Sequence, residues 1–145
     1  MIIPDANILI YAYDERAPEV EAARSWLEES LANSDVGFGW QTLTAFIRIS
    51  TEKRVFPLPH SVVDAFEIIR NWLSAPKATI LLPTSNHLSI FMNLAVASKT
   101  MGAMLMDAHL AALAIEHGAT LATTDRDFRR FDGLKLMNPL VKIKT

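Results

Sequence analysis

The chain has 145 residues, half of them hydrophobic, and a formal net charge of −2 from 14 Lys and Arg against 16 Asp and Glu. This length fits one domain with its own core, and the lack of cysteine excludes disulfides, thiolate metal sites and a cysteine nucleophile. No stretch has the pattern of a signal peptide or a membrane span, so we expect a cytoplasmic protein with no membrane partner. The slight negative charge argues against binding nucleic acid through a basic surface alone, although metal held by acids supplies positive charge locally.

Strand-like and helix-like patterns alternate along the whole chain, judged by apolar spacing and by the proline, glycine and polar residues that bound each run. In chain order we expect a strand at 2–3, helices at 7–13 and 18–32, a strand at 36–40, helices at 42–51 and 62–73, a strand at 79–82, helices at 86–99 and 107–117, a strand at 119–123, a polar loop at 124–133 and a strand at 134–137. This order predicts an α/β fold of three layers, α/β/α, with a central, mostly parallel sheet in one domain over 1–145.

Several element ends have specific signals. Pro4 lacks the donor that a central strand needs, so we expect the first strand to end before it. Ser61 and Ser85 are predicted N-caps, and Gly118 a helix C-cap. The side chains that helical spacing places inward after Ser61 are Val62, Phe66, Ile69 and Leu73.

Distant stretches of the chain each deliver carboxylates to one edge of the predicted sheet. Asp5 follows the first strand, Asp125 and Asp127 follow the strand at 119–123, and Asp107 opens a helix. Ligand sites of parallel sheets lie beyond the carboxyl ends of the strands. Clustered carboxylates repel one another unless a cation is present, and Mg²⁺ or Mn²⁺ prefers such oxygen ligands. A bound ion of this kind can activate water for attack on a phosphodiester.

Each acid taken alone has a simpler interpretation. Asp5 could be a turn residue and Asp107 only an N-cap. Asp125 and Asp127 could both form local side-chain-to-backbone turns. The hypothesis of a metal site therefore depends on the four acids occurring together.

Two motifs resemble those of PIN-domain ribonucleases. The first is Asp5-Ala6-Asn7 directly after a hydrophobic strand, and the second runs from Asp107 through a helix ending in Gly118 to Thr123-Thr124-Asp125-Arg126-Asp127-Phe128. The middle, from Trp40 to Phe56, is similar to VapC-type toxins, so the resemblance spans nearly the whole chain. It implies a PIN-like fold and a Mg²⁺- or Mn²⁺-dependent endoribonuclease, a hydrolase that is the toxin of a type II toxin–antitoxin system.

The resemblance also implies roles for individual residues and partners. The implied catalytic acids are Asp5, Asp107, Asp125 and Asp127. The implied metal ligands are Asp5, Asp107 and Asp125. The residues implied to support them are Asn7, Thr123 and Thr124. The candidate RNA-binding arginines are Arg48, Arg126, Arg129 and Arg130. The implied partners are the RNA substrate, a cognate antitoxin and a second copy in a homodimer.

One position departs from the family pattern, which places a glutamate three residues before the arginine that is Arg48 here. This chain has Ala45 at that position, and Glu52 lies about 10 Å further along a helix axis. A second hypothesis is therefore a catalytically impaired PIN-like module that acts through protein binding. We set a phospho-receiver domain aside, because Asp5 has no acidic neighbour early in the chain and no lysine ends the strand at 119–123.

Overall fold

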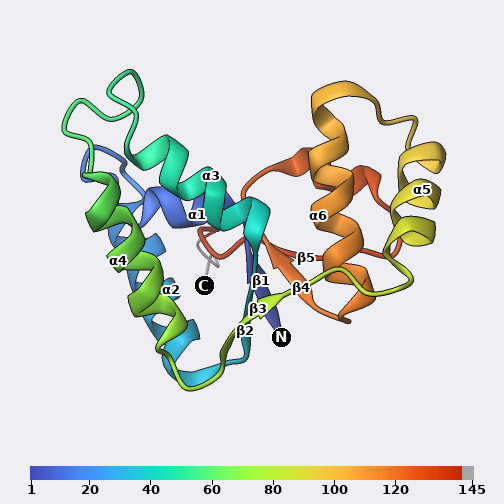
Figure 1. Cartoon of the computed structure of the whole chain (residues 1–145), viewed down its shortest axis with the longest axis horizontal. Helices are drawn as coiled ribbons and strands as arrows, with labels where there is room; N and C mark the ends of the chain where they lie inside the picture. The colour runs from blue at the N-terminus through green and yellow to red at the C-terminus, as the bar shows by residue number, and fades with distance from the viewer. Residues whose placement is uncertain (142–145) are drawn as a thin grey trace.

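The computed structural model describes residues 1–141, so the last four residues of the predicted domain lie outside the described part (Figure 1). Its elements are β1 (Ile2–Pro4), α1 (Ala6–Tyr11), α2 (Val20–Asn33), β2 (Val36–Gly39), α3 (Trp40–Ser50), α4 (Val62–Leu73), β3 (Ala78–Leu81), α5 (His87–Ala97), the 3₁₀ helix η1 (Gly102–Met104), α6 (Leu105–Glu116), β4 (Thr120–Ala122), the 3₁₀ helix η2 (Arg126–Arg130) and β5 (Lys135–Met137). Among these described helices, none is long and apolar enough to cross a membrane.

The five strands form one sheet in the order β3-β2-β1-β4-β5, and each neighbouring pair is parallel. β1 therefore lies at the centre, and the prediction of a mostly parallel sheet is confirmed. The prediction that β1 stops before Pro4 is wrong, since Pro4 aligns with Ala122 of β4. The pairing of β1 with β2 is confined to Ile2 and Val36, and the next bond to β4 comes from the amide of Asp5. Pro4 thus needs no donor.

Helices cover both faces of the sheet, as the three-layer prediction requires (Figure 1). Side chains alternate between the faces of a strand, so neighbouring residues enter different cores. Ile3 of β1 and Leu121 of β4 pack under α6, whereas Val36 and Phe38 of β2 face the side that carries α1 to α4. All strands deliver their carboxyl ends to the same edge, between these two helical layers.

The buried face of α4 differs from the predicted one. Of the four side chains predicted to point inward, Ile69 is buried and Leu73 packs partly buried against the core, so that part of the prediction is confirmed. Val62 and Phe66 are instead 56% and 51% exposed, and Ala65 and Trp72 are buried with Ile69. The Trp72 ring stacks on Phe38 with centroids 5.7 Å apart, and this contact turns the helix by about one residue from the predicted orientation. Helical spacing alone does not distinguish the face with Val62 and Phe66 from the adjacent face with Ala65 and Trp72, because both faces carry apolar residues.

Three further boundaries bear on the predictions. Ser61 caps α4 as expected, since its Oγ accepts a hydrogen bond from the amide of Asp64 at 3.0 Å. The prediction for Ser85 is wrong, because α5 begins at His87 after Asn86 and has no side-chain cap bond. α6 begins at Leu105, so Asp107 lies in its first turn rather than capping it. The predicted loop at 124–133 contains η2.

Candidate active site at the carboxyl edge of the sheet

Asp5 lies at the junction where β1 ends and α1 begins. It caps α1, and its Oδ1 accepts a hydrogen bond from the amide of Ala6 at 2.7 Å. Its Oδ2 accepts a bond of 2.7 Å from the hydroxyl of Thr123, which directly follows β4. Because β1 and β4 are neighbours in the sheet, these two bonds fix the Asp5 carboxylate at the centre of the carboxyl edge.

The Thr123 hydroxyl connects the two motifs that the sequence keeps apart. It is 5% exposed, and besides donating to Asp5 it accepts from the amide of Asp125 at 3.0 Å and from the Asn7 side chain at 3.4 Å. The Asn7 side chain also donates to the hydroxyl of Thr124 at 3.0 Å. The structure therefore brings Asp5, Asn7, Thr123, Thr124 and Asp125 together in one network.

Asp125 combines a turn role with its place at the site. Its Oδ1 accepts a bond of 2.8 Å from the amide of Asp127 and so begins η2, as the simpler interpretation expected. Asp127 is exposed and adds its negative charge near the same edge.

Asp107 reaches this edge from the other helical layer, in the first turn of α6. Its pKa is raised to about 6, first by burial and then by the charges of Asp125 and Asp5. The guanidinium of Arg130 opposes this shift. The pKa of Asp5 is also raised, first by burial and then, against its two hydrogen bonds, by the charge of Asp125. These acids are thus close enough to oppose one another's ionisation.

The residues fit a hydrated divalent ion. Within residues 1–141, no three histidine or acid side chains are already arranged around a common ion position. Mg²⁺, however, keeps several waters and is commonly held by one or two carboxylates, so such an arrangement is not required. The acids offer only oxygen ligands, and the Oδ1 atom of Asn7 is buried without a partner in the described chain, where a water or ligand would satisfy it.

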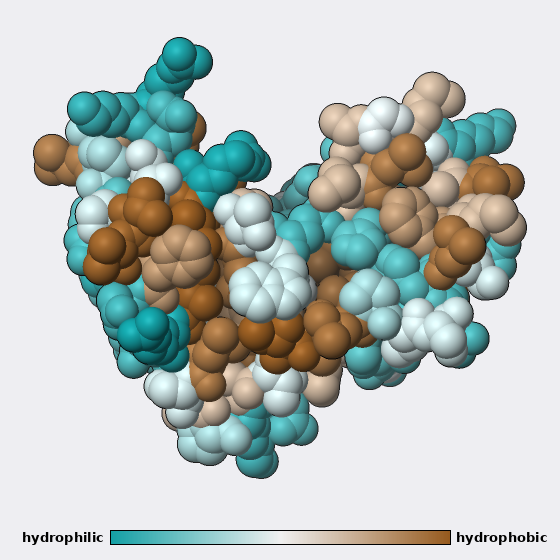
Figure 2. Space-filling model, viewed as in Figure 1, coloured by the Kyte–Doolittle hydropathy of each residue, from teal (hydrophilic) through white to brown (hydrophobic). Residues whose placement is uncertain are grey.

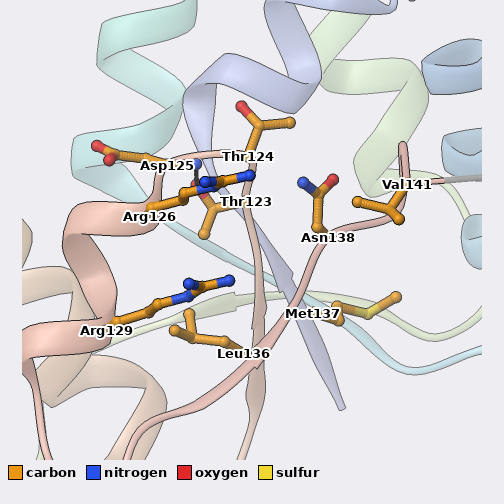
Figure 3. A pocket seen from close by; sticks show the side chains of 9 residues that line it. All are labelled: Thr123, Thr124, Asp125, Arg126, Arg129, Leu136, Met137, Asn138 and Val141. Atoms are coloured by element: carbon orange, nitrogen blue, oxygen red, sulfur yellow. Dashed lines mark hydrogen bonds between the residues drawn. The ribbon is translucent and has the colours of Figure 1, made fainter.

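The four candidate arginines separate into different environments. Arg48 lies in the last turn of α3 and is exposed. Arg130 donates to the carbonyl of Asp127 at 3.1 Å. Arg126 and Arg129 line a cavity of about 290 Å³ beside Asp125, shown in Figure 3. Of the four arginines, only Arg126 and Arg129 therefore line a cavity next to the acids.

Gln41 is a residue of this region that the sequence analysis did not select. It lies at the start of α3, and its Nε2 donates to the carbonyl of Met106, next to Asp107, at 3.2 Å. Its Oε1 is buried and has no partner within residues 1–141. Gln41 stands one helical turn before Ala45, the position where the family pattern has glutamate. Gln41 does not stand three residues before Arg48, as the family's glutamate does. The sequence pattern therefore gave no reason to select it, and the fold alone places it next to Met106 and Asp107.

Figure 2 shows the surface hollowed above this edge, between the α3 side and the α6 side, with hydrophilic residues in the hollow. The arrangement described here therefore lies in an open cleft that a long, anionic substrate can enter. Several carboxylates there favour a cation, and arginines beside them favour phosphate.

Comparison with known sequences gives matches over almost the entire chain. The family model described as PIN domain matches residues 2–134. A protein named Ribonuclease VapC37 from Mycobacterium tuberculosis is 38% identical over 140 residues, which cover 96% of this chain and 97% of that protein. VapC ribonuclease Mb2897 from Mycobacterium bovis is 39% identical over 142 residues, 97% of this chain and 96% of that protein.

Two solved structures illustrate the fold that this chain shares. VapBC2 from Rickettsia felis, bound to a DNA fragment from their promoter, matches with a TM-score of 0.69 and 22% identity, covering 95% of this chain and 98% of that chain. VapBC-1 from nontypeable Haemophilus influenzae matches with a TM-score of 0.70 and 19% identity, covering 96% and 98%. These likenesses confirm the three-layer fold.

Proposed function

Because the chain belongs to the PIN-domain family, we propose that it is a metal-dependent endoribonuclease and the toxin of a type II toxin–antitoxin pair. The observation that carries the proposal is that Asp5, Asp107 and Asp125 lie at one sheet edge, where burial first, and then the charges of Asp125 and Asp5, raise the pKa of Asp107 to about 6. Relatives that are 38% and 39% identical over nearly their whole length are named ribonucleases, which supports the same activity here.

The three acids would hold Mg²⁺ or Mn²⁺. When bound, such an ion activates water and stabilises the leaving oxygen of a phosphodiester. Thr123 orients Asp5 by donating to Oδ2, and it holds the backbone of Asp125 through the amide. Asn7 is held by the hydroxyl of Thr124, and its buried Oδ1, which has no partner within residues 1–141, can accept a hydrogen bond from a water.

Asp127 and Gln41 would complete the site. Asp127 is exposed beside Asp125 and is suited to bind the ion through its waters rather than directly. Gln41 offers a buried amide oxygen next to Asp107, on the helix whose Ala45 leaves the family's glutamate absent. A neutral oxygen in place of a carboxylate predicts weaker metal binding, so cleavage should need a higher Mn²⁺ concentration than in a protein with glutamate.

The proposed partners are RNA, a cognate antitoxin and a second copy of the chain. We place the protein in the cytoplasm and treat residues 1–145 as one domain. Exposed apolar side chains occur on α4 at Val62, Val63 and Phe66, and on α5 at Leu88, Met92 and Val96. Brown patches in Figure 2 over the α4 side and the α5 side agree with this. Surfaces of this kind favour protein partners.

The decisive test is cleavage of pooled tRNA and mRNA by metal-free protein, with and without Mn²⁺, followed by mapping of new 5′ ends. Asp5→Asn should abolish the cuts while circular dichroism stays that of the parent. The matched control is Asp35→Asn, because Asp35 is exposed and precedes β2 at the opposite edge of the sheet. An Asp5→Asn protein that cuts RNA as fast as the parent would refute the proposal.

The impaired-module hypothesis predicts a different result. Calorimetry on the parent protein would then show no divalent-ion binding at millimolar metal, and no RNA in the pool would be cut. Metal binding that Asp107→Asn weakens and Asp35→Asn leaves unchanged supports the nuclease site.

A further inference from the structure

A cavity of about 290 Å³ lies beside Asp125, between the ends of β4 and β5. We propose that it binds one nucleotide of the RNA substrate next to the phosphodiester that is cut, with Arg126 and Arg129 on the phosphate and Asn138 on the base. This inference depends on the proposed nuclease function and adds to it the place where the enzyme recognises sequence.

The geometry of η2 explains why two arginines share this cavity. A 3₁₀ helix has 3.0 residues per turn, so side chains three positions apart are eclipsed. Phe128 of η2 and Phe131, which follows its last residue, are both buried in the core under α6, and this fixes the rotation of the helix. Arg126 and Arg129, three positions apart, then project to the same side, as Figure 3 shows.

Neither guanidinium has an ion-pair partner in the described part of the chain. Within residues 1–141, no hydrogen bond or ion pair involves the side chain of Arg126 or Arg129, whereas Arg16, Arg24 and Arg70 each pair with an acid. Figure 3 shows the Asp125 carboxylate pointing away from the cavity, so it does not cancel their charge. Two parallel arginines with free donors match the oxygens of a phosphate.

The opposite wall suits a nucleobase. Asn138 follows β5, and its Oδ1 accepts a bond of 3.0 Å from the amide of Leu140. This bond fixes the orientation of the side chain and leaves the Nδ2 donors for a ligand. Met137 supplies an apolar surface on the same side as Asn138, whereas Leu136 lies next to Arg129 (Figure 3). A fixed amide next to an apolar wall can read one edge of a base, whereas an acidic peptide would use only the arginines.

The size and position of the cavity limit the ligand to one nucleotide. Small-molecule pockets begin at about 300 Å³, so this cavity accepts a single unit of a chain that continues outside it. Thr123, Thr124 and Asp125 belong to its lining and also to the network around Asp5. An RNA strand with one nucleotide here therefore has a neighbouring phosphate at the acids.

The first test measures RNA binding without cleavage, in the Asp107→Asn background with EDTA, using a labelled pool of short randomised RNA oligonucleotides. Arg126→Ala/Arg129→Ala should weaken binding at least tenfold and reduce the slope of log K against log salt by about 1.4, since each single-strand phosphate contact contributes about 0.7. The control is Arg70→Ala, which removes an exposed arginine of α4 that pairs with Glu67. Binding equal to that of the control would overturn the proposal.

The second test measures recognition. Asn138→Ala in the active protein should keep the requirement for Mn²⁺ but change the preferred nucleotide at one position beside the cut, by about tenfold in relative rate. Asn138→Asp should change it in another way, because a carboxylate cannot donate. An unchanged cleavage pattern in both variants would refute the role of Asn138. If the parent cuts no RNA, the nuclease function fails, while the binding test still judges the cavity.

Discussion

Asp5 and Asp107 reach the same sheet edge from opposite helical layers, and the protein holds them in opposite ways. Asp5 is fixed by hydrogen bonds from Ala6 and Thr123. Asp107 accepts no side-chain hydrogen bond within residues 1–141, and burial and neighbouring acids raise its pKa to about 6. The chain itself therefore holds Asp5 in place through hydrogen bonds, whereas the charge on Asp107 is opposed by burial and by neighbouring acids and is offset only in part by Arg130.

After the complete loss expected of Asp5→Asn, the largest expected effect comes from Asp107→Asn. Cleavage should fall at least about 100-fold, because a bound metal contributes several kcal/mol of transition-state stabilisation. In metal-free protein at pH 7.5 the same variant should melt at a higher temperature than the parent, since it removes a carboxylate from a group of like charges. Calorimetric melting with EDTA and with Mn²⁺ checks both parts. If Asp107→Asn melted at a lower temperature than the parent in EDTA, this would contradict the conclusion that the Asp107 carboxylate destabilises the metal-free protein.

Thr123→Val tests the hydrogen bonds that hold Asp5 in place. The change keeps the shape of the side chain but leaves Asp5 Oδ2 and the Asp125 amide without their partner, so cleavage should fall about 10–100-fold and stability by about 1–3 kcal/mol. Thr124→Val is the matched control, because the Thr124 hydroxyl bonds only to Asn7 in the described network. Urea unfolding and initial rates measure the two effects, and equal behaviour of both variants would show that Thr123 is not the connecting residue.

The pH dependence follows from Asp107. Because its pKa is raised to about 6, the acid is protonated below that pH and binds a cation poorly, so cleavage should drop about tenfold per pH unit below about 6. Stability without metal shows the reverse: the contribution of the neutral acid is complete below pH 3.8 and is lost as pH rises through about 6. Rate profiles and urea titrations from pH 4 to 8 test this, and in Asp107→Asn the stability change over this window should become smaller, with Asp5, whose pKa is also raised, contributing the rest.

A third charged group, remote from the network around Asp5, gives the smallest prediction. Glu116 has a side chain only 1% exposed, and its Oε1 lies 2.8 Å from His87 Nδ1, while His87 Nε2 lies 2.8 Å from His109 Nδ1. His87→Leu should lower the free energy of unfolding by about 1–3 kcal/mol, because it leaves a buried carboxylate oxygen unpaired. Cleavage should not change. Adding Glu116→Leu should restore part of the lost free energy of unfolding. A double variant that loses more free energy of unfolding than the two single variants together would contradict this pairing.

The two motifs around the acids were readable because their signal is local. Asp5-Ala6-Asn7 and Thr123-Thr124-Asp125 each follow a short apolar strand, and parallel pairing brings such strand ends together. The strands were predicted to within one or two residues at most ends. The buried face of α4 was not, because Trp72 chooses its partner Phe38 from another element, and helical spacing carries no information on that contact.

What the sequence alone determined is the alternation of strands and helices, the parallel sheet and the four acids at its edge, because all of these depend on short-range spacing and on turn chemistry. What only the tertiary structure decided is which groups meet: Thr123 between Asp5 and Asp125, Gln41 beside Met106, and Asn138 in one cavity with Arg126 and Arg129. These contacts join residues as many as 118 positions apart. Packing of whole layers sets such distances, and no local pattern in the chain encodes them.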